Sequence, residues 1–249
     1  MNSLLTVESL CKNFGALRAS DGIDFDVADG ETHAVIGPNG AGKTTFISQL
    51  AGNLLPDAGR IAFAGEDITR LPAARRARKG LARSFQITSV YLEFSALQNV
   101  ALAVQAHAGH SFRFWRDARN DASLLDPARQ VLKDVGIEET KFNMLAANLA
   151  HGEQRQLEVA MALATRPRML LLDEPMAGMG TEESQRMIEL LSKLKQNKTI
   201  ILVEHDMDAV FRLADRISVL VYGRVIATDV PEKIKMNEEV RRAYLGEEA

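Results

Sequence analysis

Cysteine is almost absent from this sequence of 249 residues, which contains only Cys11. A disulfide within the chain is therefore excluded, and the scarcity is typical of proteins in a reducing compartment. Long apolar runs are also missing: none reaches the ~18 residues of a transmembrane helix, and the first residues lack the pattern of a signal peptide. A net charge of only −3 argues against a protein that binds nucleic acid through its phosphates.

Strand and helix patterns alternate along most of the chain. With 46% apolar and 25% charged residues, a packed core is expected. Short apolar runs predict strands buried on both faces, at residues 34–36, 169–172, 200–203 and 217–221. Helical patterns occupy residues 43–51, 182–195 and 207–213. This alternation predicts an α/β fold with a mostly parallel sheet.

Two regions depart from the alternation. Residues 4–30 and 60–64 have the character of an antiparallel β flank. Helical patterns dominate from about residue 88 to 164, where Asp126-Pro127 pairs a capping residue with a proline and predicts a helix start. We expect a single domain over residues 1–249, in which a core (1–87 and 165–249) carries an inserted helical lobe (about 88–164).

A glycine-rich segment directly follows the first apolar run. Residues 37–45 match the phosphate-binding pattern G-x-x-x-x-G-K-S/T in the strand–loop–helix setting that it requires. The glycines let backbone N–H groups point at phosphate oxygens, and the helix adds its positive end. Lys43 supplies charge to the β- and γ-phosphates, and the Thr44 hydroxyl can ligate Mg²⁺. The residues predicted to bind nucleotide in this P-loop are Gly37, Pro38, Asn39, Gly40, Ala41, Gly42, Lys43, Thr44 and Thr45.

Two adjacent carboxylates end a second apolar run. Asp173 and Glu174 follow residues 169–172, at the sheet edge where open α/β sheets bind ligands. Asp173 is predicted to hold the water shell of Mg²⁺, which usually keeps several waters in proteins. Glu174 is predicted to accept a proton from the attacking water or to polarise it.

Further segments distinguish between families of P-loop proteins. Residues 197–200 lack the aspartate with which GTPases read their base. Residues 148–156, NLAHGEQRQ, resemble the Leu-Ser-Gly-Gly-Gln signature of ATP-binding-cassette (ABC) ATPases. Residues 85–86 resemble the Q-loop of that family and residues 203–206 its switch-histidine loop. DNA-repair members would carry heptad repeats or zinc cysteines, and translation members two cassettes. The sequence has no heptad repeats and no zinc cysteines, and it contains one cassette. It therefore resembles a transporter ATPase over residues 4–245.

The resemblance implies ATP and Mg²⁺ as ligands and assigns roles by position. Phe14 is similar to the aromatic residue that stacks on adenine. Gln86 is similar to the glutamine that contacts Mg²⁺ and senses the membrane partner, and His205 to the histidine that contacts the γ-phosphate. We assign both to catalysis with Glu174. The signature residues, which would face ATP on a second subunit and so imply a dimer, are Ala150, His151, Gly152 and Glu153.

Two positions differ from the family pattern. Ala150 stands where serine is usual, so a hydroxyl contact to the γ-phosphate is missing, although backbone N–H groups or His151 can compensate. Gly180 stands where an aspartate usually communicates between the two ATP sites. Hydrolysis is still expected because the phosphate-binding and acidic residues are unchanged.

The subfamily is indicated by three short segments. Residues 175–179, 203–207 and 243–247 resemble ATPases of branched-chain amino acid importers, and the long segment 106–125 resembles the longer of the two ATPase subunits. This implies a hetero- or homodimer on the cytoplasmic side of the inner membrane, with two permease subunits and, indirectly, a solute-binding protein. Residues 112–116 form either a solvated hairpin or a contact with the membrane partner. The alternatives are a lipopolysaccharide-exporter ATPase, disfavoured by Glu204, and an importer of another small polar solute.

Overall fold

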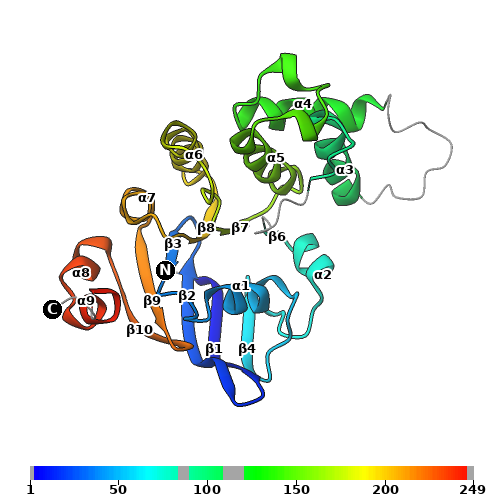
Figure 1. Cartoon of the computed structure of the whole chain (residues 1–249). Coiled ribbons are helices and arrows are strands. Elements are labelled where there is room, and N and C mark those ends of the chain that lie inside the picture. Colours follow the sequence, from blue (N-terminus) through cyan, green and yellow to red (C-terminus); the bar gives the residue numbers. More distant parts are fainter. Residues whose placement is uncertain (1–2, 84–89, 109–120, 246–249) are drawn as a thin grey trace.

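The computed structural model describes residues 3–83, 90–108 and 121–245. Among these residues the main layer is a six-stranded sheet with the order β10-β9-β3-β8-β7-β6 (Figure 1). Its strands are β3 (Thr32–Ile36), β6 (Leu81–Arg83), β7 (Met169–Asp173), β8 (Thr199–Val203), β9 (Arg216–Val221) and β10 (Arg224–Asp229). All neighbours are parallel except β9 and β10. The predicted mostly parallel sheet is confirmed, and β3, β7 and β8 are buried at every position.

The segments expected to form a flank build a second, antiparallel sheet. Within the described ranges it has four strands in the order β2-β1-β4-β5. Their bounds are β1 (Ser3–Phe14), β2 (Leu17–Ala28), β4 (Ala58–Phe63) and β5 (Glu66–Asp67). Helix α1 (Lys43–Ala51) joins both sheets in one core, because its Phe46 belongs to the same buried apolar cluster as Ile23 of β2 and Leu171 of β7. This core fixes the loop between β3 and α1.

Helices occupy the chain between β6 and β7, and they lie together at the upper right of Figure 1. They are α3 (Ala96–Ala108), α4 (Ala122–Asp134) and α5 (His151–Ala164), with the short 3-10 helices η2 (Glu139–Lys141) and η3 (Ala146–Asn148). Val100, Leu132 and Leu157 belong to one apolar cluster that reaches β7 at Leu170 and Leu172. The division into a core and a lobe at the predicted boundaries stays a prediction.

The predicted helix start at Asp126-Pro127 is wrong. Helix α4 begins earlier, where the Asp121 side chain caps its first turn, and Pro127 lies inside the helix. There the proline lacks the N–H of one helical hydrogen bond. The cap at Asp121 and the burial of Ala128 and Leu132 on one face sustain the helix despite this loss.

The remaining helices follow the strands of the main sheet or flank it. They are α2 (Ala73–Arg78), α6 (Thr181–Leu194), α7 (Met207–Leu213), α8 (Pro231–Met236) and α9 (Glu238–Leu245). Helices α1 and α7 have the predicted bounds, and α6 is shifted by one residue from its prediction. In the described part of the chain no helix is both long and apolar enough to cross a membrane.

Candidate functional site

Two glycines shape the loop between β3 and α1, because their neighbours leave no space for a side chain. A Cβ on Gly37 would lie 2.0 Å from the carbonyl oxygen of Leu220. One on Gly42 would lie 2.3 Å from the carbonyl oxygen of Ala19, and Gly42 also has a left-handed φ of 105°. The loop therefore wraps closely against β9 and β2 and leads into the positive end of α1.

A cavity of about 540 Å³ lies over this loop. The predicted site residues that it brings together are Phe14, residues 39–45, Glu174 and His205. Residues 17–19 and Tyr222 also line it, although no sequence pattern pointed to them. Phe14 is half exposed, and the Lys12 ammonium lies 5.8 Å from its ring centroid.

Lys43 is buried against the loop that precedes it. Its ammonium donates hydrogen bonds to the carbonyl oxygens of Gly37 at 2.6 Å and Pro38 at 3.0 Å. Burial lowers the pKa of Lys43, and the carboxylates of Glu174 and Asp173 oppose this effect. An anionic ligand in the cavity would therefore stabilise the charged form of Lys43.

Asp173 is buried at the end of β7 and uses one of its oxygens. Its Oδ2 accepts a hydrogen bond from Arg83 of β6 at 2.8 Å, and Arg83 also donates to Ser48 at 3.2 Å. Burial raises the pKa of Asp173, and Arg83 opposes the rise. Within the described ranges Oδ1 has no hydrogen-bond partner. This buried oxygen and the Thr44 hydroxyl in the cavity form a hard-oxygen donor set that fits hydrated Mg²⁺.

Glu174 and His205 face each other in the cavity. Glu174 Oε1 lies 2.6 Å from His205 Nε2, and because a carboxylate only accepts, the bond requires the proton on Nε2. Glu174 has a left-handed φ of 51°, a strained conformation that costs about 1 kcal/mol or more. Its N–H donates to the Val203 carbonyl at 2.9 Å, which fixes the end of β7 to the end of β8. The pair thus places a carboxylate that can accept a proton in the same cavity as the predicted phosphate-binding loop.

Glu204 fixes the backbone on both sides of this pair. It is buried, and its two oxygens accept hydrogen bonds from the N–H groups of Met176 at 2.9 Å and His205 at 3.0 Å. Burial raises the pKa of Glu204. The side chain ties the loop after β7 to the loop after β8, a role that sequence reasoning missed. A carboxylate directly after the buried strand β8 was the available signal.

The signature residues lie at the N-terminus of α5 and do not line the cavity over the phosphate-binding loop. Ala150, Gly152 and Glu153 line a separate cavity of about 190 Å³. Ala150 is the N-cap of α5, and its N–H donates to Glu153 at 3.1 Å. One chain therefore keeps its own signature apart from its own phosphate-binding loop.

Groups of the same chain contact the signature residues, Gly152 and His151 among them. The Glu183 carboxylate at the start of α6 accepts hydrogen bonds from the N–H groups of Gly152 and Gly180, each at 3.3 Å. His151 Nε2 lies 3.3 Å from the carbonyl oxygen of Ala177. An acidic group thus sits at the positive end of α5, where the sequence predicts a phosphate.

Some predicted residues lie outside the described residues. They are Gln86, together with its neighbour Phe85, and residues 112–116. Their predicted contacts with Mg²⁺ and with the membrane partner stay predictions.

Comparison with known proteins agrees with these features. A family profile described as "ABC transporter" matches residues 20–177, and one described as "Branched-chain amino acid ATP-binding cassette transporter" matches residues 224–249. The high-affinity branched-chain amino acid transport ATP-binding protein BraF of Pseudomonas aeruginosa is 39% identical over 98% of each chain. A crystal structure of the ADP conformation of MJ1267, an ATP-binding cassette of an ABC transporter, has a TM-score of 0.87 and 27% identity, covering 99% of this chain and 100% of that one.

The exporter alternative also has a relative. The lipopolysaccharide export system ATP-binding protein LptB of Haemophilus influenzae is 29% identical over 99% of this chain and 98% of its own length. It is less similar than BraF, which favours the importer side of the family. Because the ABC transporter profile covers more than half of the chain and the full-length fold agrees, this chain belongs to the ABC transporter family and is an ATPase of that family.

Proposed function

We propose that this chain is the Mg²⁺-dependent ATP-hydrolysing subunit of an importer for branched-chain or related amino acids. The contact of 2.6 Å between Glu174 and His205, inside the cavity over the phosphate-binding loop, is the observation that carries the hydrolysis. The solute class is supported by the similarity to BraF along the chain and by the matching C-terminal profile.

In this proposal ATP binds with its phosphates in the loop that precedes α1 and at the N-terminus of that helix. Lys43 exchanges its bonds to the Gly37 and Pro38 carbonyls for bonds to the β- and γ-phosphates. Phe14 stacks on the base at the other end of the cavity. Thr44, Asp173 and Gln86 would hold Mg²⁺, which neutralises phosphate charge when it is bound.

Hydrolysis follows from the groups beside the γ-phosphate. The oxygen of the attacking water forms a bond to the γ-phosphorus, and the bond from that phosphorus to the β-phosphate oxygen breaks. Glu174 accepts the proton that this water loses. His205 turns its Nε2–H from Glu174 toward the γ-phosphate and stabilises the developing charge. Glu204 holds the His205 backbone during this change.

A second ATPase subunit, identical or different, completes the site in this proposal. Residues 150–153 lie outside the nucleotide cavity of their own chain, and the Gly152 N–H becomes available to ATP on a partner when its contact with Glu183 opens. Backbone donors at a helix N-terminus suit a phosphate group.

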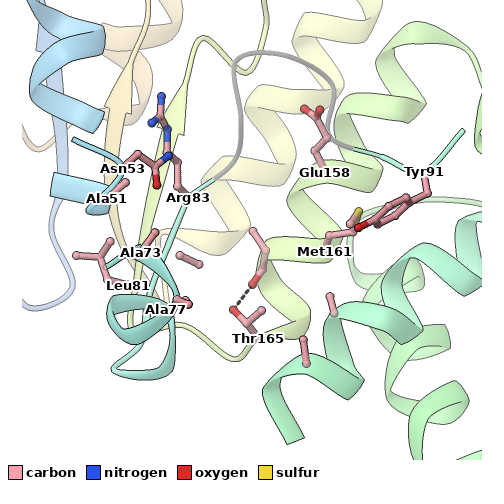
Figure 2. A pocket seen from close by; sticks show the side chains of 15 residues that line it. Ala51, Asn53, Ala73, Ala77, Leu81, Arg83, Tyr91, Glu158, Met161 and Thr165 are labelled. Atoms are coloured by element: carbon pink, nitrogen blue, oxygen red, sulfur yellow. Dashed lines mark hydrogen bonds between the residues drawn. The ribbon is translucent and has the colours of Figure 1, made fainter. Parts of the chain in front are cut away.

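A groove between α2 and β6 on one side and α3 and α5 on the other is the proposed docking place for a permease. Its cavity is about 510 Å³, and Figure 2 shows Leu81 and Ala77 facing Met161 and Tyr91 across it. Small side chains line much of it, including Ala73, Ala74, Ala77, Ala103 and Ala162. Because alanines let a backbone approach closely, the groove suits a short apolar helix from a cytoplasmic loop of the membrane partner.

Two arginines on the α2 and β6 side of this groove contact Asp173 and helix α1. Arg83 lines the groove and forms the ion pair of 2.8 Å with Asp173. Arg76 of α2 donates to the carbonyl oxygens of Gln49 at 2.6 Å and Leu50 at 2.7 Å, at the end of α1. Movement of a helix in the groove would therefore reach both Asp173 and the phosphate-binding helix. This arrangement supports a peripheral location at the cytoplasmic face of the inner membrane.

The test is reconstitution in vesicles with the candidate permease pair, partner ATPase and solute-binding protein. Leucine-loaded binding protein should stimulate ATP turnover and drive uptake of labelled leucine. ATP turnover that is unaffected by any amino acid would contradict the importer assignment.

Filling the groove tests the docking place in the same vesicles. Ala77→Trp should abolish the stimulation, whereas Ala58→Trp, on an exposed position of β4, should keep it. Melting temperatures check that both variants fold, and full stimulation of Ala77→Trp would exclude this groove as the docking place.

A further inference from the structure

Tyr222 is an exposed aromatic residue at the edge of the nucleotide cavity. It lies in the turn between β9 and β10, has 85% of its surface exposed, and lines the same cavity as the phosphate-binding loop. Such exposure of a large ring is costly in water and gives no packing energy to the fold. The side chain is therefore accessible to a ligand in the cavity.

The backbone of Tyr222 is strained as well. Its φ is 47°, in the left-handed region that a bulky residue rarely adopts. Among the described residues five non-glycine residues have positive φ, and the two that line this cavity are Glu174 and Tyr222. Strain of this kind gathers at ligand sites, where the surrounding structure maintains it.

The turn is fastened to the phosphate-binding loop. Gly223 donates its N–H to the Ala41 carbonyl at 2.8 Å, and its own carbonyl accepts from Asp21 of β2 at 2.8 Å. Arg224 adds an ion pair of 2.7 Å to Asp21. The backbone at Tyr222 is thus held close to the predicted phosphate-binding loop, and the exposed side chain extends from this fixed point along the edge of the cavity.

The lining of the cavity changes in character from one part to another. The loop and α1 offer backbone N–H groups, hydroxyls and Lys43, whereas Phe14, Leu17 and Tyr222 offer large hydrophobic side chains and are 51%, 66% and 85% exposed. The phosphates suit the first part, so the base and ribose suit the second.

We infer that Tyr222 is a nucleotide-binding residue, whose ring forms a second aromatic wall of the base subsite together with Phe14. The ligand is the purine ring of a nucleoside triphosphate, which has an apolar face for each ring to contact. The inference rests on the proposed nucleotide site. It adds base recognition by the β9–β10 turn, which takes part in neither phosphate binding nor hydrolysis.

Substitutions that separate the ring from the backbone strain test the inference. Tyr222→Asn removes the ring but tolerates the left-handed conformation, so ATP affinity should fall roughly five- to a hundred-fold while the melting temperature without nucleotide stays equal or rises. Tyr222→Phe should bind ATP within about two-fold of wild type, because it keeps the ring. Met236→Asn, at another exposed apolar residue outside the cavity, should leave ATP affinity unchanged.

Inorganic tripolyphosphate separates failure of this inference from failure of the nucleotide site. It lacks a base, so wild type and Tyr222→Asn should bind it equally in calorimetric titrations. Unchanged ATP affinity of Tyr222→Asn, or an equal loss for ATP and tripolyphosphate, would overturn the role in base binding. If wild type bound neither ligand, the nucleotide site itself would be wrong.

Discussion

The phosphate-binding cavity and the signature segment differ in how far a single chain completes them. The cavity brings together Lys43, Glu174 and His205, which come from three separate segments of the chain. Each of these segments follows a buried strand, namely β3, β7 and β8. The signature segment has no hydroxyl at Ala150, and the N–H of Gly152 is already bonded to Glu183 of the same chain. The groups proposed for hydrolysis are thus brought together by one chain, whereas in the segment that would face a partner one N–H group, that of Gly152, is occupied by an internal contact.

This difference separates catalytic capacity from control. Residues on parallel strands are positioned by the core and need no partner to approach one another. Negative charge is favoured at a helix N-terminus, so a phosphate group of higher charge can compete with the Glu183 carboxylate for the N-terminus of α5. The predictions below test first the completed cavity and then the closed segment.

The largest effect is expected for Glu174→Gln. The amide cannot accept the proton of the attacking water, so ATP turnover should fall by about 10²- to 10⁴-fold while ATP binding is kept. Phosphate release and equilibrium binding measure the two properties separately. Glu232→Gln, at an exposed position of α8, should leave both unchanged. Turnover of Glu174→Gln within a few-fold of wild type would show that another group is the base.

A smaller loss is expected for Lys43→Ala. Hydrogen bonds to a charged group contribute about 1.5–3 kcal/mol, so ATP should bind roughly ten- to a hundred-fold more weakly. AMP lacks the β- and γ-phosphates and should lose much less. Isothermal titration with both nucleotides measures this, with the exposed Lys193→Ala as a control. Equal losses for ATP and AMP would contradict the predicted contact.

Local sequence patterns predicted the residues of the predicted phosphate-binding loop and of the acidic strand better than the distant residues that contact or surround them. The helix at residues 43–51 and the strand that ends in Asp173 follow from spacing within a few residues, and the structure contains both. The nucleotide contacts predicted for the loop before this helix stay predictions. The Arg83–Asp173 ion pair joins residues 90 positions apart, and Tyr222 approaches residues 39–45 only through the sheet order. Such pairs depend on tertiary structure, which periodicity does not describe. The wrong helix start at Asp126 has a local cause instead, because an earlier cap at Asp121 was available.

The smallest effect concerns Ala150→Ser and has two parts. As the N-cap of α5, serine can accept a hydrogen bond from the helix's own N–H groups, which alanine cannot, and this should stabilise the chain by about 1 kcal/mol. The melting temperature without nucleotide measures this part. A decrease would contradict the N-cap position of residue 150.

The second part concerns the partner. If the segment faces ATP on a second copy of the chain, the serine hydroxyl adds a contact to the γ-phosphate, and the fraction of ATP-bound dimer should rise in a Glu174→Gln background. Glu183→Gln should act in the same direction, because a neutral amide competes less well than a carboxylate for the Gly152 N–H. Gel filtration with ATP measures the dimer fraction of each variant.

The variant His151→Ala tests the imidazole ring in the same measurement. If the ring contacts ATP on the partner, its removal should lower the dimer fraction. If the ring only contacts Ala177 of its own chain, its removal should leave the dimer fraction unchanged. If none of these variants changes the dimer fraction, the segment does not contact nucleotide in a homodimer, and the same measurement repeated with a second ATPase subunit then tests the heterodimer.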